Sequence, residues 1–178
     1  MVTGMPHCHP ELFVCDITNA ILKDDMASME HPFFSLSKKP DLQVRSYEHN
    51  RNRLEIIPSV KGLATIYDKD ILIYAISQLI AGRNQGKDLE PCITISARDL
   101  LMFTNRHTGG YNYTLLEEAL TRLSGTRIKT NIKTGGQEQT DIFGLIESGT
   151  LVRDNKTDRV TELRIKLSDW VFNAINAQ

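Results

Sequence analysis

The sequence predicts an α+β fold built around a helix–turn–helix unit that is followed by a β-hairpin. Three observations in residues 92–146 support this prediction: two short helical segments, a glycine-containing turn between them, and a change from helical to strand spacing of the apolar residues after Gly125. Helix, turn, helix and hairpin in this order indicate a winged helix-turn-helix with additional β-hairpins. Such a unit presents a helix and a hairpin to nucleic acid or to a second copy of itself.

The totals of the chain fit one domain with a short extension. The chain has 178 residues, of which 40% are hydrophobic, and a formal net charge of −1. No segment approaches the roughly 20 apolar residues that cross a bilayer, so we expect no membrane partner. Cys8, Cys15 and Cys92 are few and unpaired in motif, which indicates a reducing, cytoplasmic location. Because the charge is near zero, we expect any DNA contact to be local, weak or completed by another region.

Residues 1–30 are acid-rich and are predicted to form an N-terminal arm that is mobile or packed on a partner, ahead of a winged-helix domain at 31–178. His7, Cys8 and His9 could hold a metal. Metal-binding histidines usually stand on a rigid strand with supporting contacts, whereas these lie near the chain start between prolines. We therefore expect no metal site.

Residues 31–39 are expected to form a loop, and 42–57 a β-hairpin. Leu42 and Val44 alternate with polar residues before a polar turn. The hairpin is locally basic, which makes its cations candidates for a secondary DNA contact, with a solvated turn as the alternative. These candidates are Arg45, Arg51 and Arg53.

A long helix follows, expected to be capped by Asp68 and to end at Gly82 and Gly86. Apolar residues cover most of its circumference, which predicts burial on more than one side. It is either the central helix of the domain or a helix that packs both on its own core and on a partner. We expect a homodimer whose seam uses this helix or the strands around 42–57. The candidate dimer residues of the helix are Ile71, Leu72, Ile76, Leu79 and Ile80.

The helix–turn–helix begins with Ser96, which has Asp99 three residues later, a spacing close to a capping box. The second helix is expected to be capped by Asn112 or Thr114 and to end at Gly125, since glycine tolerates a left-handed C-cap.

The outward face of that second helix carries Glu117 and Glu118, which oppose a polyanion, so we expect poor base reading. The turn before it is better placed, because backbone N–H groups at a helix start can bind phosphate; an ordinary glycine turn is the alternative. The candidate DNA-binding residues of this unit are Arg106, His107, Thr108, Gly109, Gly110, Asn112, Thr114 and Arg122.

Residues 127–146 are predicted to be the wing. Ile128 and Ile132 alternate with polar residues, and a glycine pair turns the chain back. Arg127, Lys129 and Lys133 share one strand face, which favours contact with a DNA backbone over the alternative of a solvated face. A further hairpin is expected within 151–167, and a final helix begins near residue 168.

The sequence resembles the plasmid replication initiator protein A family over residues 31–175. Three runs carry the resemblance: TIYDKDILIYAISQLIAGRNQGK, ISARDLLMFTNRHTGGYNYTLLEEALTRLSGTRIKTNIKTGGQEQTDIFGLI and LSDWVFNAI. The resemblance implies a protein that binds repeats in double-stranded plasmid origin DNA and recruits the host replication initiator and helicase. Such proteins commonly have two winged helices in tandem, the first for dimerisation and auxiliary backbone contacts. This chain holds one such unit, so we expect it to be the N-terminal domain.

Two other interpretations remain. The chain could be a stand-alone winged-helix transcription regulator. It could also be a metal-dependent DNA-nicking enzyme that uses His7 and His9 with Tyr111 or Tyr113. No phosphate-binding glycine fingerprint and no nucleophile motif accompanies these residues. We therefore expect no enzymatic activity and no cofactor.

Overall fold

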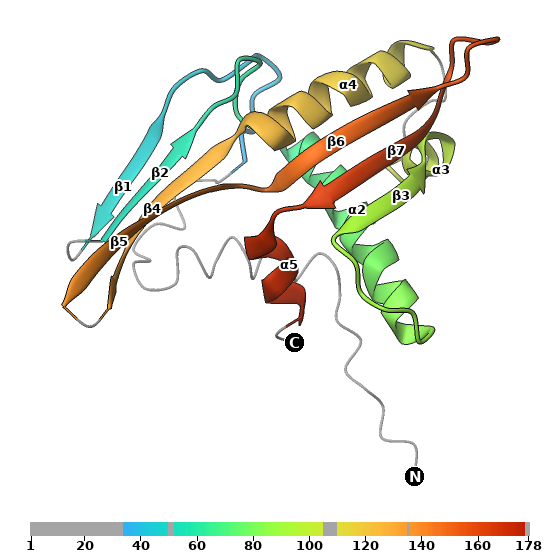
Figure 1. Ribbon diagram of the computed structural model, residues 1–178. Coiled ribbons are helices and arrows are strands. Elements are labelled where there is room, and N and C mark those ends of the chain that lie inside the picture. The colour runs from blue at the N-terminus through green and yellow to red at the C-terminus, as the bar shows by residue number, and fades with distance from the viewer. Residues whose placement is uncertain (1–33, 50–51, 105–109, 135, 177–178) are drawn as a thin grey trace.

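The computed structural model describes residues 34–49, 52–104, 110–134 and 136–176 (Figure 1). The predicted arm at 1–30 lies outside the described residues. The chain mixes helices and antiparallel strands, so the α+β class is confirmed. The elements in chain order are β1 (Arg45–His49), β2 (Asn52–Ile57), α2 (Ile66–Asn84), β3 (Cys92–Ser96), α3 (Ala97–Phe103), α4 (Gly110–Gly125), β4 (Arg127–Thr134), β5 (Gln137–Gly144), β6 (Ile146–Arg153), β7 (Val160–Leu167) and α5 (Asp169–Asn176).

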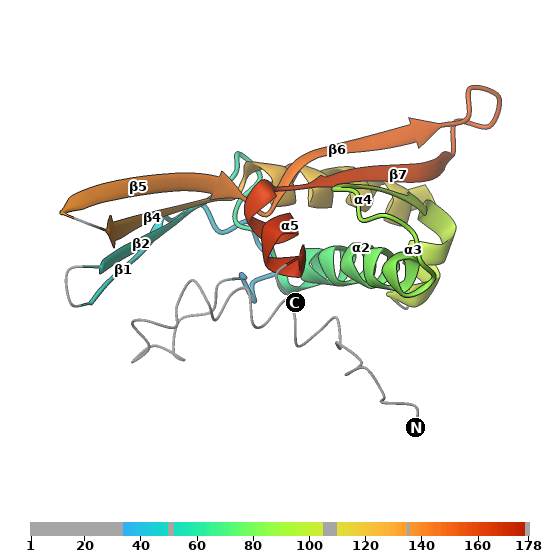
Figure 2. The same cartoon turned by 60° about the horizontal axis from the view of Figure 1, so that its bottom comes forward.

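The strands form two antiparallel sheets at opposite ends of the molecule. One sheet has the order β1-β2-β4-β5 and the other has the order β3-β7-β6. Strand β5 continues through Leu145 into β6, so one chain segment joins the two sheets. Figure 2 shows α2 and α3 on one side of the β3-β7-β6 sheet, and the other sheet projecting away from the helices. We call the β1-β2-β4-β5 sheet the inserted sheet.

The winged helix consists of α2, β3, α3, α4, β6 and β7, and its wing is the β6–β7 hairpin. Strand β3 pairs with β7, which places Ile95 opposite Leu163 in the same sheet as β6. The predicted hairpin at 127–146 is confirmed, because β4 pairs with β5 from Arg127 opposite Gly144 to Thr134 opposite Gln137. Its role as the wing is not, because β4 also pairs with β2, with Ile128 opposite Ile56, in a sheet separate from the one that contains β3. Alternation in a sequence indicates a strand but not its neighbour, so the two hairpins could not be told apart.

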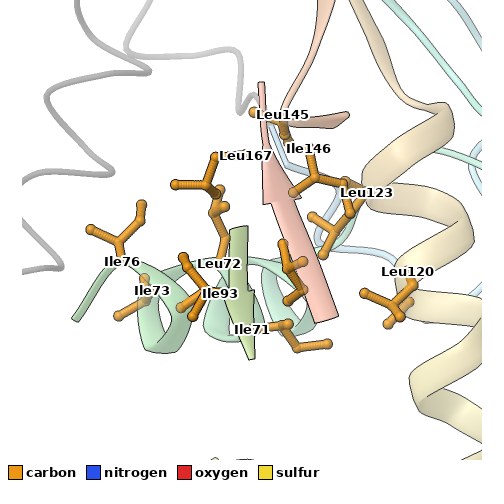
Figure 3. Packing of buried hydrophobic residues seen from close by; sticks show 14 of the residues in the cluster. Ile71, Leu72, Ile73, Ile76, Ile93, Leu120, Leu123, Leu145, Ile146 and Leu167 are labelled. Atoms are coloured by element: carbon orange, nitrogen blue, oxygen red, sulfur yellow. The ribbon is translucent and has the colours of Figure 1, made fainter. Parts of the chain in front are cut away.

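Helix α2 is the central helix of the domain. Ile71 and Ile76 are 0% exposed, and Figure 3 shows the apolar residues of this helix close to Ile93 and Leu167 of the overlying strands. The candidate dimer residues Ile71, Leu72, Ile76, Leu79 and Ile80 are all at most 9% exposed within the single chain. The expectation that their apolar surface exceeds one core is therefore wrong, because β3, α3 and α4 pack against the helix and cover it within the single chain.

The starts of the helices differ in detail from the prediction. Thr65, not Asp68, is the N-cap of α2: its Oγ1 accepts from the Asp68 N–H at 3.2 Å, and Asp68 Oδ2 accepts from the Thr65 N–H at 2.9 Å. Asp68 therefore completes a capping box from the third helical position. Ser96 is confirmed as the cap of α3. Helix α4 already begins at Gly110, ahead of both expected caps.

Gly125 ends α4 for a reason other than the predicted one. The glycines with positive φ in the described chain are Gly62, Gly86 and Gly136, so Gly125 does not adopt the left-handed conformation. A Cβ atom built on Gly125 would instead lie 2.5 Å from the Cβ of Ser59. The turn around Ser59, which is 7% exposed, thus packs directly on the backbone at the end of α4, and only glycine leaves room for it.

We predict that Gly125→Ala lowers the free energy of unfolding by about 1–3 kcal/mol, because the added methyl group overpacks against Ser59. Urea denaturation measures the effect. Gly82→Ala is the matched control, since a Cβ there would come no closer than 3.7 Å to Lys87 Cδ. In the interior of α2 that change should stabilise the protein by up to about 1 kcal/mol. Equal effects of the two substitutions would contradict the packing argument.

Candidate nucleic-acid interface

The predicted DNA-binding residues lie at two opposite ends of the molecule (Figure 1). The first turns of α4, with Gly110, Asn112 and Thr114, lie at the end that carries the β6–β7 wing. The β4 candidates lie in the inserted sheet, beyond the other end of α4. The structure therefore does not assemble one continuous site. The remaining candidates Arg51, Arg106, His107, Thr108 and Gly109 lie outside the described residues.

The wing tip is a tight turn that exposes two cations. Asp154 Oδ1 accepts from the Lys156 N–H at 2.7 Å, and Asp154 N–H donates to the Arg159 carbonyl at 2.9 Å. These bonds hold the turn together and leave the side chains of Lys156 and Arg159 exposed. Neither cation was a predicted site residue. The signal in the sequence is an aspartate-rich turn flanked by cations between two alternating strands.

Cations of the inserted sheet already have acidic neighbours. Arg53 Nη2 lies 2.7 Å from the carboxylate of Glu55, and Lys129 Nζ lies 3.9 Å from it. Glu55 is two residues after Arg53 in β2 and stands opposite Lys129 of β4. Arg45 is on the opposite face of the sheet and lies 2.8 Å from Asp41; this hydrogen bond lowers the pKa of the Asp41 carboxyl. The carboxylates reduce the positive charge that this sheet can offer to a phosphate.

Arg127 and Lys133 are the other two candidates in β4. Arg127 is exposed at the start of the strand, and Lys133 lies near its end. Both remain candidates for a contact made by the inserted sheet.

Arg122 is not placed to contact DNA. Its Nε and Nη2 donate to the two carboxylate oxygens of Asp68 at 2.7 and 2.9 Å, and the exposed fractions of the two side chains are 18% and 1%. The hydrogen bonds to Asp68 raise the pKa of Arg122. The guanidinium group joins the end of α4 to the start of α2. Because its Nε and Nη2 already donate to Asp68, the prediction that Arg122 binds DNA is corrected.

The outer face of α4 is acidic. The side chains of Glu117 and Glu118 are 65% and 45% exposed. A groove of about 370 Å³ separates this face from β6. An acidic helix face repels phosphates and lacks the donors that read base edges. A DNA backbone would therefore be contacted better by the first turn of α4 and by the wing than by this face. The groove is lined by Glu117, Leu120, Thr121, Ser124, Gly149, Leu151 and Arg153.

The described residues hold no metal-binding cluster: no three His, Cys, Asp or Glu side chains among them gather as ligands would. His7 and His9 lie outside this part of the chain. Within the same described ranges, no helix combines the length and hydropathy needed to span a bilayer.

The helices α2, α3 and α4 with the β3-β7-β6 sheet define a winged-helix protein, to which the β1-β2-β4-β5 sheet is added. A model of the family described as "Replication initiator protein A" matches residues 23–178. The chain belongs to this family. It is 34% identical over 169 residues to a "Putative replication protein" of Wigglesworthia glossinidia brevipalpis, a match that covers 93% of this chain. The chain spans 61% of the length of that relative.

Solved structures of RctB share the fold. A structure of its domains 2 and 3 superposes with a TM-score of 0.61 at 12% identity, covering 90% of this chain and 63% of that chain. A second structure of the same domains gives a TM-score of 0.54 at 14% identity, over 79% of this chain and 55% of that chain. At these identities the likeness concerns the fold alone.

We predict that Arg122→Met lowers the free energy of unfolding by about 3–5 kcal/mol, because it leaves the buried Asp68 carboxylate without its counter-charge. Chemical denaturation of the single variants and of Arg122→Met/Asp68→Ala measures the coupling. The double variant should lose less than the sum of the two single losses. Glu118→Gln is the control, since this exposed carboxylate lies 3.9 Å from Arg122 and should contribute about 0.5 kcal/mol or less. Additive losses would contradict the pairing.

Proposed function

We propose that this replication-initiator domain contributes dimerisation and auxiliary binding of the origin-DNA backbone during initiation of plasmid replication. The observation that carries the DNA-binding part is the placement of the α4 N-terminus and the wing at one end of the molecule (Figure 1). In this proposal the partners are double-stranded origin repeats, a second copy of the chain, and the host replication initiator and helicase. The domain acts in the cytoplasm, without catalysis and without a cofactor.

Backbone contact, not base reading, is the role that the charges support. Backbone N–H groups and the helix dipole favour an anion at the start of α4. Lys156 and Arg159 extend the wing tip beyond that point and have no acidic partner among the described residues. Glu117 and Glu118 on the helix face, in contrast, disfavour insertion of α4 into a major groove.

The contribution to origin binding is auxiliary in this proposal, because the chain supplies little net positive charge and spans only part of the length of its relative. The formal net charge is −1, and the chain spans 61% of the curated relative. An initiator of that length has room for a second DNA-reading unit that would supply most of the sequence specificity. Tight, sequence-specific binding of one operator by this chain alone would instead support a stand-alone transcription regulator.

The edge of the inserted sheet is the surface that best supports a dimer. Strand β1 is the last strand in the order β1-β2-β4-β5, so one of its edges has no neighbouring strand within the described residues. Leu42 and Val44, directly before this strand, are 62% and 55% exposed. An open strand edge beside exposed apolar side chains is a template for pairing with another strand. The proposed seam therefore lies at residues 42–57 and not on α2.

For the DNA contact we predict that Lys156→Ala/Arg159→Ala lowers the slope of log affinity against log salt by about one per lost phosphate contact. Fluorescence anisotropy with a labelled origin duplex at several salt concentrations measures the slope. Lys129→Ala is the matched control at the other end of the molecule and should leave the slope unchanged, because that ammonium group lies in the inserted sheet, far from the wing and beside the Glu55 carboxylate. A loss with Lys129→Ala and none with the wing variant would move the contact to the inserted sheet.

For the dimer we predict that Val44→Lys weakens self-association at least about tenfold, because it places a charge beside the open strand edge, a device that blocks edge pairing. Sedimentation velocity over a range of protein concentrations measures the dissociation constant. Val60→Lys changes a side chain that is 89% exposed on a separate turn and should have no effect. A wild-type chain that stays monomeric at high micromolar concentration would refute the dimer itself.

A further inference from the structure

An ion pair spans the groove between α4 and the wing. Arg153 Nη2, at the end of β6, lies 3.7 Å from Glu117 Oε2 in α4, and the side chains remain 39% and 65% exposed. The other terminal nitrogen of Arg153, Nη1, donates to the Asp158 carbonyl at 3.3 Å in the wing turn. One guanidinium group thus connects the turn of the wing to the outer face of the helix.

We propose that Glu117 restrains DNA binding at this end of the domain by holding Arg153 on α4 and away from phosphate. This inference rests on the proposed function, since it assigns an internal competitor to the same surface. The carboxylate of Glu117 acts twice. It offsets the charge of Arg153, and its own charge repels a phosphate that approaches the same guanidinium.

The pair is suited to competition because it contributes little to the fold. Exposed ion pairs stabilise proteins only weakly, so Glu117 can be neutralised without unfolding the domain. A phosphate that takes its place would gain a bidentate partner in Arg153. The bond from Nη1 to the Asp158 carbonyl would persist in that event, because it lies within the wing itself.

Glu118 provides an internal comparison. It lies next to Glu117, carries the same charge and is 45% exposed, but its cationic neighbour at 3.9 Å is Arg122. Arg122 is already held by both oxygens of Asp68. Neutralising Glu118 therefore removes one negative charge from the face and releases no cation, whereas neutralising Glu117 does both.

The test compares the 178-residue wild type, Glu117→Gln, Glu118→Gln, Arg153→Ala and Glu117→Gln/Arg153→Ala on a labelled duplex of random sequence at several salt concentrations. Glu117→Gln should bind about 3–10-fold more tightly at low salt, with a salt slope steeper by about one. Glu118→Gln should tighten binding about twofold or less without a change of slope. Arg153→Ala and the double variant should both keep the wild-type slope, because neither can add the new contact. The denaturation midpoints of all five proteins confirm folding.

Two outcomes overturn the restraint alone. If Glu117→Gln and Glu118→Gln tighten binding equally with unchanged slopes, only net charge matters and Arg153 is not released. If the salt slope of Glu117→Gln/Arg153→Ala is as steep as that of Glu117→Gln, the gained contact belongs to another cation. In both cases the wild type still binds DNA, and the proposed function survives. Failure of all five proteins to bind duplex DNA would overturn the proposed function together with the restraint.

Discussion

The ion pair between Asp68 and Arg122 is the constraint on which the winged helix depends. Asp68 is 1% exposed, and its carboxylate receives the Arg122 guanidinium and also caps α2 through the Thr65 N–H. Nearby, the Ala64 N–H donates to the buried Thr126 hydroxyl at 2.9 Å. Both bonds tie the start of α2 to the end of α4. They set the direction of α4, and hence which face of the helix turns toward the wing. Without Arg122, the buried Asp68 carboxylate would lower the stability of the fold.

Local features of the fold were predictable from the sequence, whereas partnerships between distant segments were not. The α+β class, the cap Ser96 and the hairpin at 42–57 follow from residue types and spacing within a few positions. The identity of the wing does not, because β4 and β6 both follow α4 and both have a hairpin partner. Only the pairing of β3 with β7 shows which sheet belongs to the helices, and that pairing joins residues about 70 positions apart.

The candidate site shows the same limit. The acidic face of α4 is predictable from the sequence, because the residues that share a face of one helix follow from their spacing alone. Helix spacing puts Arg122 on the outward face of α4, which favours a DNA contact, but its partner Asp68 lies 54 residues earlier in the chain. The sequence does not single out Lys156 and Arg159, because strand spacing predicts their turn only as part of an additional hairpin. For the helix–turn–helix loop, the candidates at 106–109 fall outside the described residues.

The direct passage of β5 into β6 connects the two sheets of the domain through the backbone of a single residue. Leu145 alone separates the strands; it is 1% exposed, and its carbonyl accepts from the Ser168 N–H at 3.4 Å. There is no loop at this junction to absorb displacement, and the stacked rings of Phe143 and Trp170, 5.0 Å apart, brace it from α5. Leu145 and the Phe143–Trp170 pair therefore fix the point at which the chain leaves the inserted sheet and enters the sheet of the wing.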